Sequence, residues 1–420
     1  MLCPMPNDRY VIHGGAPLRG EVAVSGSKNA ALYTLPAALL TAEPVVLRNV
    51  PRIADIDELA EICRTVGANV EIDGTTVRMH TPAITSTAPP AELIARLRAS
   101  FLLMGALLGR AGEASCPPPG GDVIGARPLD VHFVGFKMLG ATVEAGGGVW
   151  HARGPALCGA RIFFDYPSVL GTVNVLFAAV RAEGETVIVN AAPEPEVEML
   201  ADMLVSMGAS IRGHGTPTIT VEGVPVLHGT DFEVIPDRLE AGTYLFAAAA
   251  TGGDVRVTNA VPGHLDSVIA KLREMGVQVD AGEGVRATVT GPLLPVQVQA
   301  VPYPGFATDL HPPVAAALTR APGMSIVHER VYDNRTLYVN ELRKLGARII
   351  TAGQIVIIEG GGRLTGSTVR ALDIRAGAAT VVAALAAEGE STILDIHHLD
   401  RGYADLQGQL SALGARIERR

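Results

Sequence analysis

Residues 412–419 read ALGARIER, and five earlier stretches have the same form: TVGANVEI at 65–72, MLGATVEA at 138–145, SMGASIRG at 206–213, EMGVQVDA at 274–281 and KLGARIIT at 344–351. Each is typical of the end of an amphipathic helix, a glycine cap and a short alternating strand. The glycines are separated by 73, 68, 68, 70 and 68 residues, and they are Gly67, Gly140, Gly208, Gly276, Gly346 and Gly414. The spacing predicts six copies of one unit.

A second marker, an alanine-rich segment followed by a tight turn and a strand, lies earlier in the copies. Examples are FAAVRAEGETVIVN at 177–190, FAAAATGGDVRVTN at 246–259 and VVAALAAEGESTIL at 381–394. Each copy is therefore expected to run strand, helix, strand, helix, strand. Because the alanine-rich helices are apolar nearly all round, we expect an α/β fold with these helices inside and the sheets outside.

Six copies divide naturally into two domains of three. The predicted domains are residues 22–235 and residues 1–21 with 236–420. The N-terminal stretch YVIHGGAPLRGEVAVSG is expected to supply a strand pair that completes the second domain.

Composition limits the classes of partner. Of the 420 residues, 48% are hydrophobic and 18% are charged, which predicts a large buried core. The net charge of −9 argues against nucleic acid or an anionic membrane as a partner, but not against small anionic substrates. No apolar run has the length of a signal peptide or a membrane span, so a cytoplasmic protein is expected. The four cysteines lack CxxC spacing, which favours neither disulfides nor a metal site.

Polar residues recur just before the alanine-rich helices. They follow one another at intervals of 70, 70, 70, 71 and 66 residues, and they are Lys28, Arg98, Ser168, Arg238, Asp309 and Arg375. One interpretation is a set of charged helix starts in water. However, a cation at a helix N-terminus opposes the helix dipole, whereas a cation beside free N–H groups makes an anion site.

A second polar set is expected in the loops before the other helix of each copy: Asp55, Arg127, Glu194, Glu196, Arg335 and Arg401. If the two domains face each other, both sets line one locally basic cleft. Such a cleft suits a substrate that carries phosphates and carboxylates.

The stretch PPPGGDVIGARPLD at 117–130 has the prolines and glycines of a loop rather than of a helix or a central strand. It is either a flexible connector or a mobile lid over a site, and we predict the lid at about 114–126. The lid carries one acid, Asp122, five residues before Arg127.

Seven segments, in order SGSKNAAL, GGDVIGARPLDVH, PDRLEAGTYL, TDL, DNR, DIRAGA and DRGY, resemble the signature segments of the UDP-N-acetylglucosamine 1-carboxyvinyltransferase family. The resemblance covers essentially the whole chain. It implies the two-domain inside-out α/β barrel of that family, built from six repeated units with three in each domain.

The resemblance also implies an activity. The family transfers enolpyruvyl from phosphoenolpyruvate to the 3′-hydroxyl of UDP-N-acetylglucosamine and releases phosphate, without a metal or an organic cofactor. This is the first committed step of peptidoglycan precursor synthesis, a cytoplasmic process that serves cell wall biogenesis, cell shape and cell division. Such a reaction needs a general acid, a general base and several cations.

The resemblance implies roles for individual residues. Asp122 would supply a proton, Asp309 would take the proton of the sugar hydroxyl, and Lys28 and Arg401 would act on phosphoenolpyruvate. Substrate binding is expected from a larger set: Asn29, Arg98, Arg127, Pro128, Leu129, Asp130, Val131, Pro167, Ser168, Val169, Arg238, Val331, Arg335, Asp373 and Arg375.

The chain departs from the commonest family pattern in two places. Asp122 stands where many members have cysteine, and Cys116 lies outside the motif position. This predicts resistance to fosfomycin, an epoxide that alkylates the thiol, because a carboxylate is a poorer nucleophile. A glycine is also shifted in SVLGT, at Leu170 and Gly171, which leaves open a preference for another nucleotide sugar. Transfer to shikimate 3-phosphate and a non-catalytic nucleotide-sugar-binding paralogue are also open interpretations.

Overall fold

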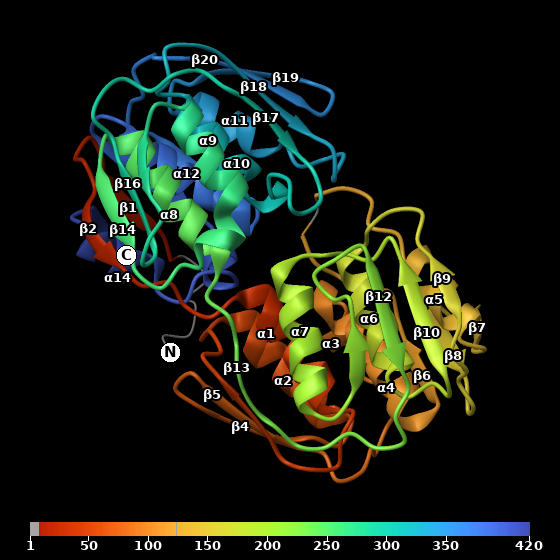
Figure 1. The fold of residues 1–420 in the computed structure, drawn as a ribbon. Helices are drawn as coiled ribbons and strands as arrows, with labels where there is room; N and C mark the ends of the chain where they lie inside the picture. The colour runs from red at the N-terminus through yellow and green to blue at the C-terminus, as the bar shows by residue number, and fades with distance from the viewer. Residues whose placement is uncertain (1–7, 123) are drawn as a thin grey trace. The chain divides into compact units, whose positions relative to one another are not determined.

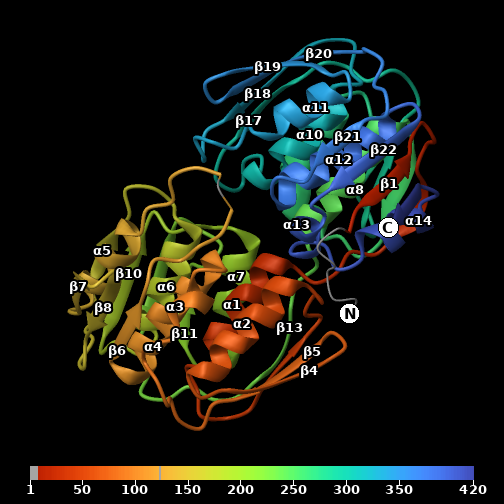
Figure 2. The ribbon, with the colours of Figure 1, turned by 180° about the vertical axis from the view of Figure 1, so that it is seen from behind.

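The computed structural model of the chain describes residues 8–122 and 124–420. Contacts divide these residues into two compact units (Figures 1 and 2). Unit 1 contains 8–25, 124–126 and 236–420, and unit 2 contains 26–122 and 127–235. Across the described chain, every helix is too short or too polar to cross a bilayer.

Unit 2 has an inside-out arrangement, with helices at its centre and sheets outside them (Figure 1). Its described residues form three sheets with strand orders β13 (Asp231–Glu233), β3 (Val45–Arg48), β5 (Thr76–His80), β4 (Asn69–Asp73); β6 (Glu113–Cys116), β8 (Val149–Arg153), β7 (Thr142–Gly146); and β11 (Ser210–Arg212), β12 (Thr218–Glu222), β10 (Glu185–Val189), β9 (Arg161–Phe163). The helices are α1 (Lys28–Ala38), α2 (Ala54–Thr65), α3 (Ala91–Ile94), η1 (Arg98–Leu102), α4 (Leu103–Ala111), α5 (Asp130–Met138), α6 (Val169–Ala179) and α7 (Pro195–Ser206).

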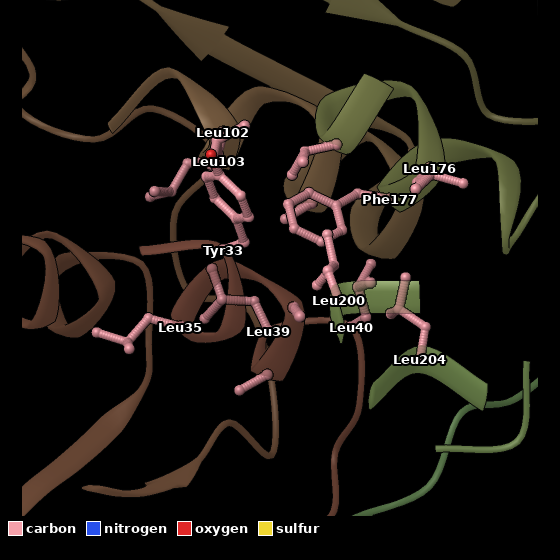
Figure 3. Close-up of a cluster of buried hydrophobic side chains, with 14 of the residues drawn as sticks. Tyr33, Leu35, Leu39, Leu40, Leu102, Leu103, Leu176, Phe177, Leu200 and Leu204 are labelled. Atoms are coloured by element: carbon pink, nitrogen blue, oxygen red, sulfur yellow. The ribbon is translucent and has the colours of Figure 1, made fainter. Parts of the chain in front are cut away.

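The centre of unit 2 is packed by aliphatic and aromatic side chains from several helices. Figure 3 shows Leu35 of α1, Leu39 at the C-cap of α1, Phe177 of α6 and Leu200 of α7 in one cluster of side chains. These side chains are fully buried. The prediction that the apolar helices lie inside is therefore confirmed.

Unit 1 repeats the arrangement. Its described residues also form three sheets, with orders β21 (Thr368–Arg370), β22 (Glu390–Leu394), β1 (Tyr10–His13), β23 (Arg416–Arg419); β15 (Gln278–Asp280), β16 (Val285–Thr288), β14 (Asp254–Val257), β2 (Arg19–Val22); and β17 (Gln297–Ala300), β18 (Gly323–Glu329), β20 (Ile355–Gly360), β19 (Arg348–Ala352). The buried helices α8 (Arg238–Thr251), α10 (His311–Leu318) and α12 (Ile374–Ala386) pack on one another. The others are η2 (Pro262–Leu265), α9 (Asp266–Glu274), η3 (Thr308–Leu310), α11 (Tyr338–Lys344), α13 (His397–Asp400) and α14 (Leu406–Ala412).

The glycines that suggested the repeat have the predicted conformation. Gly67, Gly140, Gly208, Gly276, Gly346 and Gly414 each follow the cap residue of a helix and have φ between 83° and 113°. A residue with a Cβ atom adopts this left-handed region only with strain, so glycine ends all six helices in the same way.

The predicted order of elements within a repeat was one strand short. The third repeat runs β9, α6, β10, α7, β11, β12, in which β11 and β12 form a closing hairpin. The sixth repeat ends at β23, and strand β1 takes the place that β12 has in the third, between β22 and β23. The N-terminal strands thus complete two sheets of unit 1.

Two repeats exchange their first strands. In the third repeat, β9 precedes the buried helix and pairs in parallel with β10 after it. Strand β2 precedes α1 but pairs with β14, while β13 precedes α8 but pairs with β3. The exchange assigns β2 to unit 1 and β13 to unit 2.

Candidate active-site residues in each unit

The polar residues found in register all lie at the starts of the buried helices. Lys28 and Arg238 are the first residues of α1 and α8, Ser168 is the N-cap of α6, and Arg375 is in the first turn of α12. Arg98 and Asp309 lie in the 3₁₀ turns that lead into α4 and α10. Because these side chains are buried or half-buried, the interpretation as helix starts in water is wrong.

In unit 1, the carboxylate of Asp309 lies between two arginines. Arg335 donates from Nη1 to Oδ1 at 2.7 Å, and Arg375 donates from Nε to Oδ2 at 3.1 Å. The arginine side chains are each 5% exposed and that of Asp309 is 24% exposed. Two cations therefore surround one anion in a largely dry environment.

The charges set the protonation state of Asp309. Burial alone would raise the pKa of this carboxyl group, but Arg335 and Arg375 outweigh burial and hold the pKa well below its usual range. Both oxygens of the carboxylate are occupied by guanidinium donors. In this arrangement Asp309 is a weak base.

Each arginine has a second anchor. Arg335 also donates from Nη1 to the hydroxyl of Thr308 at 2.9 Å, while its buried Nε has no hydrogen-bond partner among the described residues. Arg375 donates from Nη1 to the hydroxyl of Tyr403 at 3.3 Å, and its guanidinium carbon lies 5.6 Å from the centre of that ring. Arg335 thus keeps donor capacity that an anionic ligand could use.

Other predicted residues of unit 1 have structural contacts of their own. Asp373 is the N-cap of α12 and accepts from the backbone N–H groups of Arg375 and Ala376. The guanidinium carbon of Arg238 lies 5.6 Å from the ring centre of Tyr303. Arg401 is half-buried just after α13, and Val331 is 37% exposed.

In unit 2, Lys28 forms a buried ion pair. Its Nζ lies 2.7 Å from Oδ2 of Asp55, and the two side chains are 8% and 1% exposed. Asp55 lies in the first turn of α2 rather than in the loop where it was predicted. The neighbouring residue Asn29 is half-buried in the first turn of α1.

Arg98 and Arg127 hold the backbone of the glycine-rich loop. Arg98 donates from Nη2 to the carbonyl of Arg127, and Arg127 donates from Nη2 to the carbonyl of Asp122 at 2.7 Å. Gly121 has φ +107°, and a Cβ there would lie 2.9 Å from Cβ of Arg98. The predicted lid began too early, since residues 114–116 belong to strand β6.

The two segments expected to hold the nucleotide lie side by side. Gly171, in the first turn of α6, approaches Val131 of α5 so closely that a Cβ would lie 2.7 Å from Cγ1 of Val131. Ser168 caps α6 by accepting from the N–H of Gly171 at 3.2 Å. Asp130 accepts from the hydroxyl of Tyr166 at 3.0 Å. The close packing against Val131 therefore explains why glycine occupies position 171.

Cys116 is not available for the chemistry that a thiol would do. It is fully buried, and burial raises the pKa of its thiol to about 12. A buried neutral thiol is unreactive. Asp122, by contrast, is half-buried in the loop.

The chain is similar to known carboxyvinyltransferases over nearly its whole length. The model of the family described as EPSP synthase (3-phosphoshikimate 1-carboxyvinyltransferase) matches residues 12–410. UDP-N-acetylglucosamine 1-carboxyvinyltransferase 3 of Caldanaerobacter subterraneus subsp. tengcongensis is 48% identical over 98% of this chain and 99% of that protein. UDP-N-acetylglucosamine 1-carboxyvinyltransferase 2 of Carboxydothermus hydrogenoformans is 46% identical over the same shares. The chain belongs to the UDP-N-acetylglucosamine 1-carboxyvinyltransferase family.

Two solved structures share this fold. The enolpyruvyl transferase NikO from Streptomyces tendae superposes with a TM-score of 0.87, at 28% identity over 99% of each chain. EPSP synthase from Acinetobacter baumannii superposes with a TM-score of 0.75 at 20% identity, over 98% of this chain and all of that one, and shows the fold alone. The predicted fold class of the carboxyvinyltransferase family is confirmed.

Several residues that support the predicted ones were missed from the sequence. Tyr403 and Thr308 anchor the two arginines, and Glu329 anchors Thr308. Tyr403 and Thr308 lie within the quoted segments DRGY and TDL, so the segments contained the signal. Glu329 lies two residues before Val331 in HERVYDNR, but a charged residue at the end of a strand gives no sign of being buried.

Proposed function

We propose that this protein transfers enolpyruvyl from phosphoenolpyruvate to the 3′-hydroxyl of UDP-N-acetylglucosamine, with release of phosphate. The observation that carries the proposal is the 48% identity, over nearly the whole chain, to a relative named for that carboxyvinyl transfer. Buried Lys28 and Arg375 at helix starts, together with buried Arg335, support it, because both substrates are anions.

The proposed chemistry proceeds by addition and elimination. C3 of phosphoenolpyruvate gains a proton, C2 becomes electrophilic, and the sugar oxygen attacks C2 as its proton leaves. The tetrahedral intermediate then expels phosphate as C3 loses a proton, so the products are the enolpyruvyl ether and inorganic phosphate. We assign the proton donor to Asp122 and the acceptor of the hydroxyl proton to Asp309, with Lys28 and Arg401 stabilising the phosphate and carboxylate charges.

The remaining predicted residues are proposed to bind substrate. Around phosphoenolpyruvate we place Asn29, Arg98, Arg127 and Arg375, and Arg238, Arg335 and Asp373 complete the set. The nucleotide is assigned to Pro128, Leu129, Asp130, Val131, Pro167, Ser168, Val169 and Val331.

The low pKa of Asp309 adds a requirement. A carboxylate whose oxygens both accept from arginines takes a proton poorly. A bound phosphate or carboxylate would compete for the same guanidinium groups, and Arg335 has an unused Nε donor for it. We propose that the anionic substrate draws the arginines from Asp309 and so raises its basicity when it is needed.

A direct test is release of inorganic phosphate from phosphoenolpyruvate, measured with and without UDP-N-acetylglucosamine. Phosphate and the enolpyruvyl ether should appear in equal amounts only with both substrates, and Asp309→Asn should lower kcat at least about 100-fold. Absence of product from the wild-type protein would overturn the proposal, and product at the wild-type rate from Asp309→Asn would overturn the role of Asp309.

The acid in the loop has its own test. Asp122→Asn cannot donate the proton and should lose turnover. Because a carboxylate attacks an epoxide poorly, fosfomycin should leave the wild-type enzyme active, whereas Asp122→Cys should be inactivated with time. A covalent adduct on Asp122, or on the buried Cys116, would show that the reactive position is misassigned.

The identity of the sugar that accepts the enolpyruvyl group is the part of the proposal that has a specific alternative. The contact between Gly171 and Val131 lies within the segments assigned to the nucleotide, so a preference for another nucleotide sugar is a second candidate. The same phosphate assay with other UDP-sugars, and with shikimate 3-phosphate, separates these acceptors. A nucleotide-sugar-binding paralogue without catalysis would bind the sugar and release no phosphate with any of them.

We also propose that residues 22–235 and residues 1–21 with 236–420 act as the two domains of the enzyme. The reaction would take place in the cytoplasm as the first committed step of peptidoglycan precursor synthesis, and so would serve cell shape and cell division. Neither nucleic acid nor a membrane is a proposed partner.

A further inference from the structure

A chain of buried hydrogen bonds lies behind Asp309 in unit 1. The hydroxyl of Tyr338 lies 3.1 Å from Nε2 of His311, and Nδ1 of His311 lies 3.0 Å from Oε2 of Glu329. The same oxygen of Glu329 accepts from the hydroxyl of Thr308 at 2.7 Å. The side chains of His311 and Glu329 have no exposed surface.

Each hydrogen bond in this chain has a defined donor and a defined acceptor. Burial alone would raise the pKa of Glu329, but its hydrogen bonds lower the pKa below the usual value, so Glu329 is an ionised acceptor. His311 therefore donates from Nδ1, and because burial lowers its pKa, its neutral Nε2 accepts from Tyr338. Thr308 commits its only proton to Glu329, which leaves its lone pairs for a donor.

The donor to Thr308 is Arg335. One nitrogen, Nη1, donates both to the hydroxyl of Thr308 at 2.9 Å and to Oδ1 of Asp309 at 2.7 Å. If Thr308 could turn its proton toward Arg335, the two groups would repel each other. Glu329 prevents this by holding the proton.

Glu329 also holds the backbone that leads to Arg335. Its second oxygen accepts from the N–H groups of Val331 at 2.8 Å and Tyr332 at 3.2 Å. One carboxylate therefore fixes the 3₁₀ turn that carries Asp309 and the loop that carries Arg335. Neither of its oxygens reaches Asp309 directly.

We infer that Thr308 and Glu329 are positioning residues, which fix the guanidinium of Arg335 against Asp309 through one shared nitrogen, with His311 and Tyr338 behind them. The consequence for turnover rests on the proposed function. A displacement of the order of 1 Å between reacting groups lowers rates by up to about 100-fold.

The test uses three substitutions of threonine. Thr308→Val keeps the shape but removes the hydroxyl, and Thr308→Ser keeps the hydroxyl. The matched control is Thr319→Val, because Thr319 is 3% exposed in the same repeat and donates only to the carbonyl of Ala316. We expect Thr308→Val to lower kcat at least about tenfold, and the other two variants to stay within about twofold of the wild type.

Melting temperatures separate positioning from stability. If Thr308→Val and Thr319→Val lose similar stability and only Thr308→Val loses kcat, the inference is supported. It is overturned if Thr308→Val keeps its kcat, if Thr308→Ser falls as far, or if Thr319→Val falls equally.

A crystal structure of Thr308→Val tests the positioning role independently of the proposed function. Lengthening of the contact between Arg335 Nη1 and Asp309 Oδ1 supports positioning, and an unchanged contact overturns it, whichever reaction the enzyme performs. A wild-type protein that makes no enolpyruvyl ether would overturn the proposed function alone.

Discussion

The buried ion pair in unit 2 gives a stability prediction that needs no assumption about activity. The Nζ of Lys28 lies 2.7 Å from Asp55, and both side chains are nearly inaccessible to water. Asp55→Asn removes the negative charge but keeps the size, and so takes away the charge of Asp55 that compensates the buried ammonium group of Lys28. Breaking a buried pair in this way costs about 3–5 kcal/mol.

The expected loss can be expressed as a melting temperature. In a domain of about 150–250 residues, 1 kcal/mol corresponds to about 2–4 °C, so Asp55→Asn should melt about 6–20 °C below the wild type. Circular dichroism or calorimetry at neutral pH measures this directly.

An exposed pair in the same unit is the matched control. Arg48 and Asp231 join β3 and β13 at 2.6 Å, but their side chains are 53% and 51% exposed. Asp231→Asn should therefore lower the melting temperature much less than Asp55→Asn does. The double variant Lys28→Met with Asp55→Asn removes both charges and should recover most of the stability lost in Asp55→Asn. Equal melting temperatures for Asp55→Asn and Asp231→Asn, or no recovery in the double variant, would refute the reasoning.

Three further predictions concern single positions. Arg335 and Arg375 hold the folded-state pKa of Asp309 below its unfolded value. The stability of the wild type relative to Asp309→Asn should therefore be largest above about pH 5 and should shrink as the pH falls below about 4. A stability difference that grows in acid would contradict this. Gly171→Ala forces a Cβ against Val131 and should cost about 1–3 kcal/mol and raise the KM for the nucleotide sugar, whereas Gly146→Ala, which meets open space, should change neither. Gly414→Ala meets no atom but has φ +89°, so urea unfolding should show a loss of about 1–2 kcal/mol, and no loss would refute strain as the reason for glycine there.

The repeat was readable from the sequence because its markers are local. A left-handed residue after a helix requires glycine, whatever packs around it, so six glycines at regular spacing identify six helix ends. The burial of the alanine-rich helices was readable for a similar reason, since no polar face is available for water.

The exchange of strands could not be read in this way. Strands β2 and β13 have four and three residues, and their partners lie more than 180 residues away along the chain. Nothing in such short segments distinguishes one parallel partner from another. The second strand of the closing hairpin, such as β12, was missed because it lies beyond the quoted stretches, such as 206–213, that defined the repeat.

The candidate site was predicted as a set of residues but not as a set of contacts. Arg335 and Asp309 are 26 positions apart and belong to different elements, so the sequence gives no sign that they bond. The buried Glu329 carries the charge of a surface residue, and only the fold reveals that four hydrogen bonds compensate its burial.

The exchanged strands have a consequence for how the gene can be divided. Strand β13 completes unit 2 before the chain leaves it, so the continuous polypeptide 26–235 carries every strand of its own three sheets among the described residues. Its two ends meet, since the N–H of Ser27 donates to the carbonyl of Ile235 at 2.7 Å, and the ends left in the rest of the chain meet likewise, where Asp237 donates to Ser25 at 2.9 Å. The segment 26–235 could therefore be excised and closed over with a short linker without removing a strand from either side, and residues 124–126 of unit 1 would be lost with it.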